Sequence, residues 1–302
     1  MRRLVFGTLM IPFALSACAT VESGVRSTET LAARALVTSE QENSLGLQVK
    51  NDLEQNQHVK YLVDPAVQLY VRGVSDKVIA FGKKDRPEVT WQVNVIDDPA
   101  TVNAFATPGG YLYVYSGLLL TASNEAELAG VMAHETGHVV ARHSARQLVA
   151  QHGLEAVSAM ALGNNPGLVG QIASGIVSKG TMLVHSRADE TEADEYGARY
   201  ASLAGYDPHA LVTFFTKLEA QQGSSPKLLS YLSDHPATPD RITHINAFIA
   251  QNHLGGSELG ASRFMAIRQR INGAAASSSS TPAHSGTTSP PARGGGSAPP
   301  PN

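Results

Sequence analysis

Residues 133–146, AHETGHVVARHSAR, hold three histidines and one glutamate within ten positions. His134 and His138 are four residues apart, so on a helix both imidazoles project from one face and can meet at one ion. Glu135 lies about 100° further round the helix, near such an ion without having to bind it. The apolar residues on both sides of the motif predict that this helix is buried, and buried histidines need partners. The stretch therefore predicts a metal-binding helix at the centre of the fold.

The H-E-x-x-H spacing of this stretch is typical of zinc peptidases. Two neutral imidazoles suit Zn²⁺, and an adjacent carboxylate can accept a proton from water. A catalytic zinc also needs a third protein ligand and an open position. The positions that would carry glycine and histidine in a metzincin are Ala141 and Ser144, so the third ligand must come from another segment. His143 is out of phase with the His134–His138 face and is expected to contact a neighbouring segment.

The segment HSRADETEADEYGARY, residues 185–200, is the best source of that ligand. Glu190 and Asp194 are four residues apart and share one face of a helix, whereas Glu192 points away. A carboxylate from this segment could complete a His₂Glu site, and Asp194 could fix the tautomer of a ligand imidazole. An acidic, alanine-rich helix exposed to solvent is the alternative.

The remaining patterns predict an α+β fold, with a small sheet beside a mostly helical body. Asp64 and Pro65 are typical of a helix start. EVTWQVNVID, residues 88–97, alternates like a half-buried strand, and NAFATPGGYLYVYSGLL, residues 103–119, predicts two strands joined by a Pro-Gly-Gly turn. Asn124 opens a long helix that is expected to run to about Gly153.

The two ends of the chain differ in composition from its middle. Residues 1–17 are typical of a signal peptide, and the single cysteine, Cys18, closes a lipobox-like Leu-Ser-Ala-Cys run, which predicts acylation there. Residues 18–37 are expected to be a tether, 38–272 the folded domain, and 273–302 a disordered tail rich in Gly, Ser and Pro. A net charge of −3 without a basic run argues against nucleic acid as a partner.

Four ordered motifs give the sequence a family resemblance: NAFATPGG at 103–110, HETGH at 134–138, SRADETEAD at 186–194 and SDHPATPDRI at 233–242. With them the chain resembles zinc metallopeptidases of the HtpX and CAAX-prenyl-protease type, and within these the small periplasmic BepA- and LoiP-like branch. The resemblance covers about residues 40–250. It implies a mostly helical, gluzincin-like zincin domain whose small sheet lies beside the H-E-x-x-H helix.

The resemblance also implies roles for individual residues. One Zn²⁺ per chain would be bound by His134, His138 and Glu190, with Glu135 as general base and Asp194 behind the ligands. His235 and Arg241 would lie beside the metal, His235 either assisting catalysis or closing the metal site. A substrate strand would pair with the backbone around Asn103, Ala104 and Phe105.

The function implied is a zinc endopeptidase that degrades misfolded or unassembled envelope proteins. The expected location is the periplasm, with a lipid anchor in the inner leaflet of the outer membrane. One alternative is a chaperone-like or scaffold lipoprotein that binds unfolded envelope proteins and rarely cuts them. The other is a structural zinc site, although such sites usually have four ligands, often cysteines. BepA-like members carry a C-terminal helical repeat domain for partner binding, where this sequence has its low-complexity tail.

Overall fold

A computed structural model describes residues 37–179, 185–220, 229–236 and 238–279. The helical elements are α2 (Ser39–Gln55), α3 (Pro65–Asp85), the 3-10 turn η1 (Pro108–Gly110), α4 (Ser116–Thr121), α5 (Glu125–Val140), α6 (His143–His152), α7 (Leu154–Ala161), α8 (Pro166–Lys179), α9 (Arg187–Leu203), α10 (Ala210–Ala220), α11 (Leu229–Asp234), α12 (Pro239–Gln251) and α13 (Ala261–Ser279). The strands are β1 (Gln92–Ile96), β2 (Ala104–Thr107) and β3 (Tyr111–Tyr115). The predicted α+β architecture is confirmed. None of the helices in the described ranges has an apolar stretch long enough to cross a bilayer.

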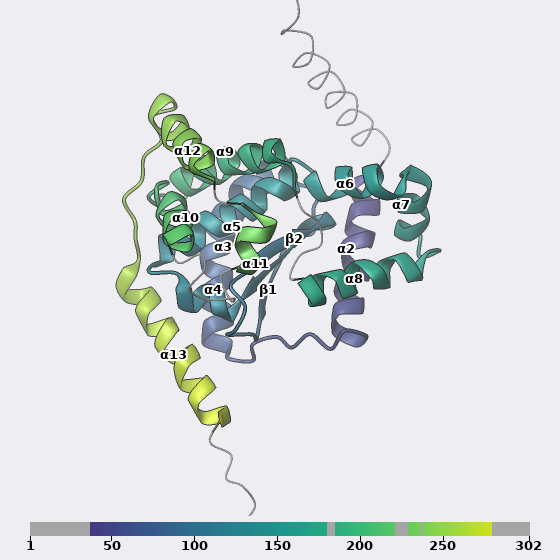
Figure 1. Cartoon of the computed structure of the whole chain (residues 1–302), viewed down its shortest axis with the longest axis horizontal. Helices are drawn as coiled ribbons and strands as arrows, with labels where there is room; N and C mark the ends of the chain where they lie inside the picture. Colours follow the sequence, from purple (N-terminus) through teal and green to yellow (C-terminus); the bar gives the residue numbers. More distant parts are fainter. Residues whose placement is uncertain (1–36, 180–184, 221–228, 237, 280–302) are drawn as a thin grey trace, which may run out of the picture.

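The three strands form one sheet in the order β1-β3-β2, with β1 parallel and β2 antiparallel to β3. Residues 93, 95, 112 and 114 belong to a large core shared with α3, α5 and α10, whereas 105, 111, 113 and 115 pack with α2 and α8 on the other face. Figure 1 shows the sheet between these two groups of helices. The expectation of a half-buried β1 is therefore wrong, because helices cover both faces of the sheet.

The predicted hairpin of β2 and β3 is confirmed, with η1 as its turn. Gly109 has φ +77° and Gly110 has φ +82°, conformations that favour glycine. A Cβ at Gly109 would also lie 2.7 Å from the backbone oxygen of Glu42, because α2 packs directly on this turn. The start of α3 is as predicted too: the Asp64 side chain accepts hydrogen bonds from the amides of Ala66 and Val67.

The helix of the H-E-x-x-H motif is shorter than predicted. It ends at Val140, and a separate helix, α6, begins at His143. Between them Arg142 takes a left-handed conformation, φ +61°, and Glu42 of α2 accepts a hydrogen bond of 2.8 Å from its Nε. The break was not predicted because the residue that stabilises it comes from a helix 100 positions earlier.

Helices α5 and α9 pack closely because glycines lie in their contact. A Cβ added to Gly197 would lie 3.2 Å from the backbone nitrogen of His134, and one added to Gly137 would lie 3.0 Å from the oxygen of Ala193. Side chains of ordinary size would push the two helices apart. The small residues thus bring the acidic face of α9 onto the histidines of α5.

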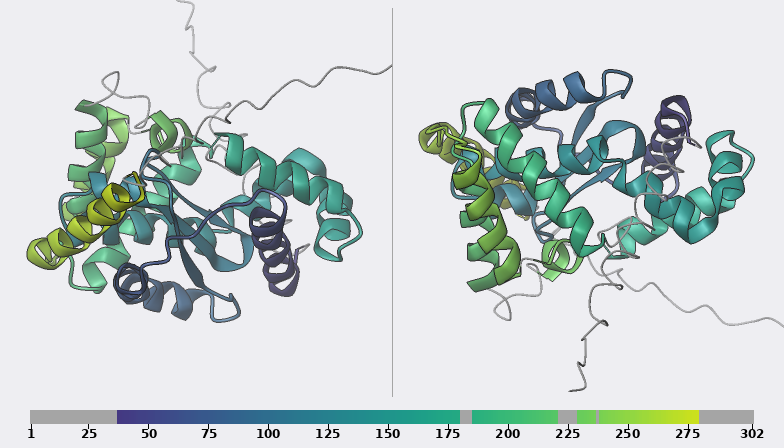
Figure 2. Two further views of the ribbon diagram at one scale, coloured as in Figure 1. Left: turned by 90° about the horizontal axis from the view of Figure 1, so that it is seen from below. Right: turned by 90° about the horizontal axis from the view of Figure 1, so that it is seen from above.

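The C-terminal helix extends beyond the predicted end of the domain. Helix α13 continues to Ser279, so residues 273–279, which were assigned to a disordered tail, are helical. Phe264, Ile267 and Ile271 are buried in the large core, and the following alanines prolong the helix that these residues anchor. Both views of Figure 2 place α13 at the opposite end of the molecule from α7 and α8.

The N-terminal boundary also shifts by one residue. Val37, assigned to the tether, is 2% exposed, and its carbonyl accepts a hydrogen bond from Arg142. The predicted signal peptide, Cys18, the rest of the tether and residues 280–302 lie outside the described residues.

Candidate metal centre

Four buried side chains from three segments meet beside the sheet: His134 and His138 of α5, Glu190 of α9, and His235 directly after α11. Nε2 of His134 lies 3.0 Å from Nε2 of His138 and 3.2 Å from Nδ1 of His235. The Glu190 oxygens lie 3.1 to 3.5 Å from the three imidazoles. Four ligands at the usual Zn–N and Zn–O distances of about 2.0–2.1 Å would be about 3.3 Å apart in a tetrahedron. The spacing of these atoms therefore fits one tetrahedral metal ion.

The charges of this group also fit a cation. Burial opposes ionisation of Glu190, but the imidazoles of His235, His134 and His138 hold its pKa well below the usual range. Burial lowers the pKa of His138, so its ring is neutral as a metal ligand must be. Burial also disfavours a charged His134, yet Asp194 and Glu190 raise the pKa of His134 to about 9. A bound cation would take the place of that proton, because it is attracted by the same two carboxylates.

Asp194 and Arg241 support the ligands from behind. Oδ1 of Asp194 lies 3.0 Å from Nδ1 of His134, on the ring edge opposite the metal site. The Arg241 guanidinium contacts both oxygens of Asp194, at 2.7 and 2.8 Å, and one oxygen of Glu190, at 2.9 Å. One arginine thus fixes the orientation of two acidic groups of α9, as expected for side chains that hold metal ligands.

Glu135 is buried at the edge of this group. Burial raises its pKa, and its Oε1 lies 3.5 Å from Nε2 of His235. That oxygen accepts no hydrogen bond from any group in the part of the chain that the structure describes. A buried carboxylate with a raised pKa and an available oxygen is suited to accept and return a proton.

The predicted substrate strand lies next to the segment that carries His235. β2 is an edge strand, and Tyr115 donates its amide to the oxygen of Asn103, so alternate residues pair with β3 and the backbone of Ala104 faces the open edge. Phe105 itself packs on the face toward α2. Asn103 Nδ2 donates to Asp234 Oδ2 at 2.9 Å, and burial raises the pKa of Asp234 to about 6.

Two contacts in this region were not predicted from the sequence, one between His143 and His138 and one between His143 and Glu192. His143 contacts α9, as expected, but its Nδ1 also lies 2.8 Å from Nδ1 of His138. Glu192 was expected to point away; it lies at the rim of α9, and its Oε2 is 3.1 Å from Nε2 of His143. The helical repeat of 3.6 residues places Glu192 away from the face of α9 that carries Glu190 and Asp194. It cannot show that α6 turns back toward Glu192.

A cavity of about 400 Å³ opens beside the metal centre. It lies between the first turns of α9 and α12 and is lined by Glu190, Thr191, Thr238 and His244, among others. The metal centre therefore lies next to a space that is large enough for a small group of a bound molecule.

A mostly helical domain with this sheet, an H-E-x-x-H helix and a glutamate from a second helix defines a zincin-type metallopeptidase. The chain belongs to peptidase family M48, whose family model matches residues 65–249.

Characterised relatives are similar over the same region. The mitochondrial metalloendopeptidase OMA1 of Schizosaccharomyces pombe is 36% identical over 183 residues, 61% of this chain and 53% of that protein. The beta-barrel assembly-enhancing protease of Escherichia coli is 29% identical over 188 residues, 59% of this chain and 38% of that protein. The chain thus matches about half or less of these relatives' length.

Proposed function

We propose that this metallopeptidase is a zinc endopeptidase of the bacterial cell envelope that degrades misfolded or unassembled proteins. The observation that carries the proposal is the tetrahedral grouping of His134, His138 and Glu190 with His235, next to the buried carboxylate of Glu135. Three imidazoles and one carboxylate are a donor set that suits Zn²⁺, with one ion per chain.

A bound zinc ion would supply Lewis-acid polarisation of the scissile carbonyl. Glu135 takes a proton from the attacking water and returns it to the leaving amine, which its raised pKa supports. Asp194 holds the ring of His134, and Arg241 holds both Asp194 and Glu190 in place. These residues do not change their protonation during the reaction; they keep the ligands oriented.

The substrate is an extended segment of polypeptide that pairs with the edge of β2. The edge position of β2 supports this, because strand addition uses main-chain hydrogen bonds and needs little side-chain specificity. At this edge the N–H of Ala104 donates to Oδ1 of Asn103 at 2.8 Å, a bond that the backbone of a substrate would have to replace. Unfolded proteins expose such segments, and folded ones rarely do. The carboxamide of Asn103 holds Asp234 and so controls how close α11 lies to this edge.

Cys18 and the residues before it support a location in the periplasm, with a lipid anchor in the outer membrane. The bacterial relatives named for β-barrel assembly are consistent with an envelope role, and within the HtpX and CAAX-prenyl-protease type we favour the small periplasmic BepA- and LoiP-like branch. Cys18→Ser should leave the protein unacylated, either soluble in the periplasm or unprocessed. Recovery of a processed mutant that is still bound to membranes would reject the anchor.

A second candidate function is a holder of unfolded envelope proteins that cuts them rarely. The position of His235 favours it, because its Nδ1 occupies a corner of the metal group that a hydrolase needs open. One experiment separates the two functions. Wild type and Glu135→Gln are incubated with an unfolded model protein, zinc content and binding of that protein are measured, and its cleavage is followed. Cleavage by the wild type alone supports the peptidase; equal binding without cleavage by either supports the holder.

A further inference from the structure

A second group of histidines lies behind the metal centre. Nδ1 of His138 is 2.8 Å from Nδ1 of His143, and Nε2 of His143 is 3.1 Å from Oε2 of Glu192 and 3.5 Å from Oδ1 of Asp189. His143 is 1% exposed, although it lies outside the group of four proposed ligands. A buried imidazole with contacts at both nitrogens is an ordered part of the site.

The two contacts of His143 define the positions of the protons. If His138 binds metal through Nε2, its Nδ1 carries the proton and must donate it. The acceptor within reach is Nδ1 of His143, whose own proton then lies on Nε2 and is donated to Glu192. In this series of hydrogen bonds from His138 to Glu192, every N–H group has an acceptor. Both imidazole rings can therefore be neutral, each with one proton.

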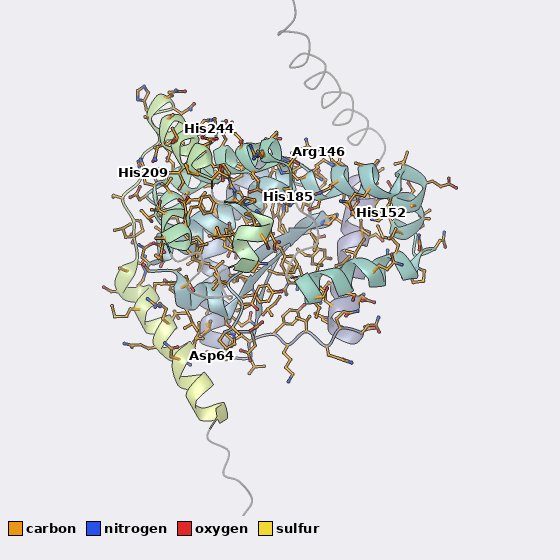
Figure 3. The ribbon with its side chains drawn as sticks, viewed as in Figure 1. Asp64, Arg146, His152, His185, His209 and His244 are labelled. Atoms are coloured by element: carbon orange, nitrogen blue, oxygen red, sulfur yellow. The ribbon has the colours of Figure 1, made fainter. Side chains whose placement is uncertain are left out.

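Each of the two α5 histidines is thus linked to a carboxylate of α9 that lies near an arginine. His134 contacts Asp194 directly, and Arg241 fixes that carboxylate. For His138 the link is longer, because His143 stands between the ring and its carboxylate. Arg146 Nη2 lies 3.8 Å from Oε2 of Glu192 and also pairs with Asp189. Figure 3 shows Arg146 near the start of α9, whereas His152, the other histidine of α6, lies further along toward α7.

A second metal ion at this place fits the geometry less well. His185 is the third histidine that could take part, but its ring stacks on that of His138 at 4.0 Å and 23°. Ring nitrogens bind in the plane of the ring, so two stacked rings do not direct their lone pairs at one point. The 2.8 Å between the two Nδ1 atoms of His138 and His143 is also shorter than the ~3.3 Å expected between two ligands of a tetrahedral ion.

We propose that His143, held by Glu192, is a positioning residue that orients the metal ligand His138 and raises its affinity for the ion. The inference rests on the proposed metal site. The left-handed turn at Arg142 is what makes the contact, because it reverses the chain after α5 and directs His143 back onto His138. The Glu42 carboxylate fixes that turn through its bond to Arg142.

The test compares His143→Leu with His143→Asn in the full-length protein. Leucine and asparagine have similar shapes, but the amide oxygen of asparagine lies where Nδ1 of histidine does and can accept the bond from His138. Zinc affinity is measured by competition with a chromophoric chelator, and the ligand geometry by the visible spectrum of the cobalt-substituted protein. We expect His143→Leu to weaken zinc binding about 10- to 100-fold and to alter the cobalt spectrum. We expect His143→Asn to recover most of both.

Two further variants make the result specific. Glu192→Gln should weaken zinc binding in the wild type and have no added effect in His143→Leu, because both act through one chain of hydrogen bonds. His152→Leu, an exposed histidine of the same helix, is the matched control and should bind zinc like the wild type.

The outcomes are distinct. Zinc affinity of His143→Leu equal to that of His152→Leu rejects the positioning role. Two ions per wild-type chain and one in His143→Leu would also overturn it, in favour of a second metal site. If His138→Ala binds zinc as tightly as the wild type, the proposed metal site itself is wrong.

Discussion

Nδ1 of His235 lies 3.1 Å from Oε1 of Glu190, although 45 residues separate them in the chain. Nε2 of His134 lies 3.2 Å from the same His235 nitrogen and 3.4 Å from the other oxygen of Glu190, Oε2. The histidine that follows α11 therefore takes the corner that water or a substrate carbonyl needs in an active zincin. The contact between Asn103 and Asp234 keeps it there.

His235→Ala should raise the rate at which unfolded substrates are cut, with zinc still bound. Removing the ring opens the fourth corner while His134, His138 and Glu190 remain. Cleavage of a fluorogenic unfolded protein and zinc content would be measured together. A steep fall in turnover with full zinc would instead mean that His235 stabilises the transition state, with Arg241 as its helper, for which a loss of about 10²–10³ is expected.

Glu135→Gln should keep the fold and stoichiometric zinc but lose proteolysis by several orders of magnitude. Glutamine occupies nearly the same volume, yet it cannot take the proton of the attacking water. Circular dichroism, zinc content and cleavage are the measurements, and Glu155→Gln, an exposed site on α7, is the control. Residual activity above a few per cent of the wild type would show that another group acts as base.

Glu190→Ala should lose both zinc and activity, as should His134→Ala. Each leaves three of the four donors, and one of these is His235, which lies on the segment after α11 and not on α5 or α9, so the remaining set should hold the ion weakly. Metal analysis after dialysis against a weak chelator tests this. Full zinc and activity in Glu190→Ala would mean that Glu190 is not a required ligand and that His235 completes the set with His134 and His138.

Acid should remove a measurable part of the stability through Glu125. Burial opposes its ionisation, but bonds from Arg263, Tyr206, Tyr70 and Lys77 lower its pKa to about 2. A carboxyl whose pKa is lower in the folded state stabilises the fold above its unfolded pKa, and the gain is lost as the pH falls from about 4.5 toward 2. Glu125→Gln should thus lower the free energy of unfolding by about 2 kcal/mol at pH 7 and by much less near pH 3. Urea unfolding of both proteins at the two pH values checks this; an equal difference at both would contradict it.

Local patterns predicted most of the fold and much of the metal centre. The spacing of His134 and His138, the shared face of Glu190 and Asp194, and the turn at Pro108–Gly110 each depend on residues close in sequence. The break after α5 depends instead on Glu42, and the role of Glu192 depends on that break. Neither leaves a local signal, since no glycine or proline lies between Val139 and His143. The predicted domain ended before the end of α13, because an alanine run next to serines looks like low complexity. In the structure, buried Phe264 anchors this helix.

The contact between His134 and His235 spans 101 residues, and this has a consequence for the order in which the molecule matures. While the chain is being synthesised, the H-E-x-x-H helix emerges well before the segment with His235 and Arg241. Contacts of such long span require closure of a large loop and form late in folding. Arg241 therefore orients Asp194 and Glu190 only once nearly the whole domain is folded, so the metal ligands of a nascent chain are not yet held in place. The same dependence inactivates a molecule that unfolds. Under the proposed function, such a molecule becomes a substrate of intact copies as soon as it loses its own activity.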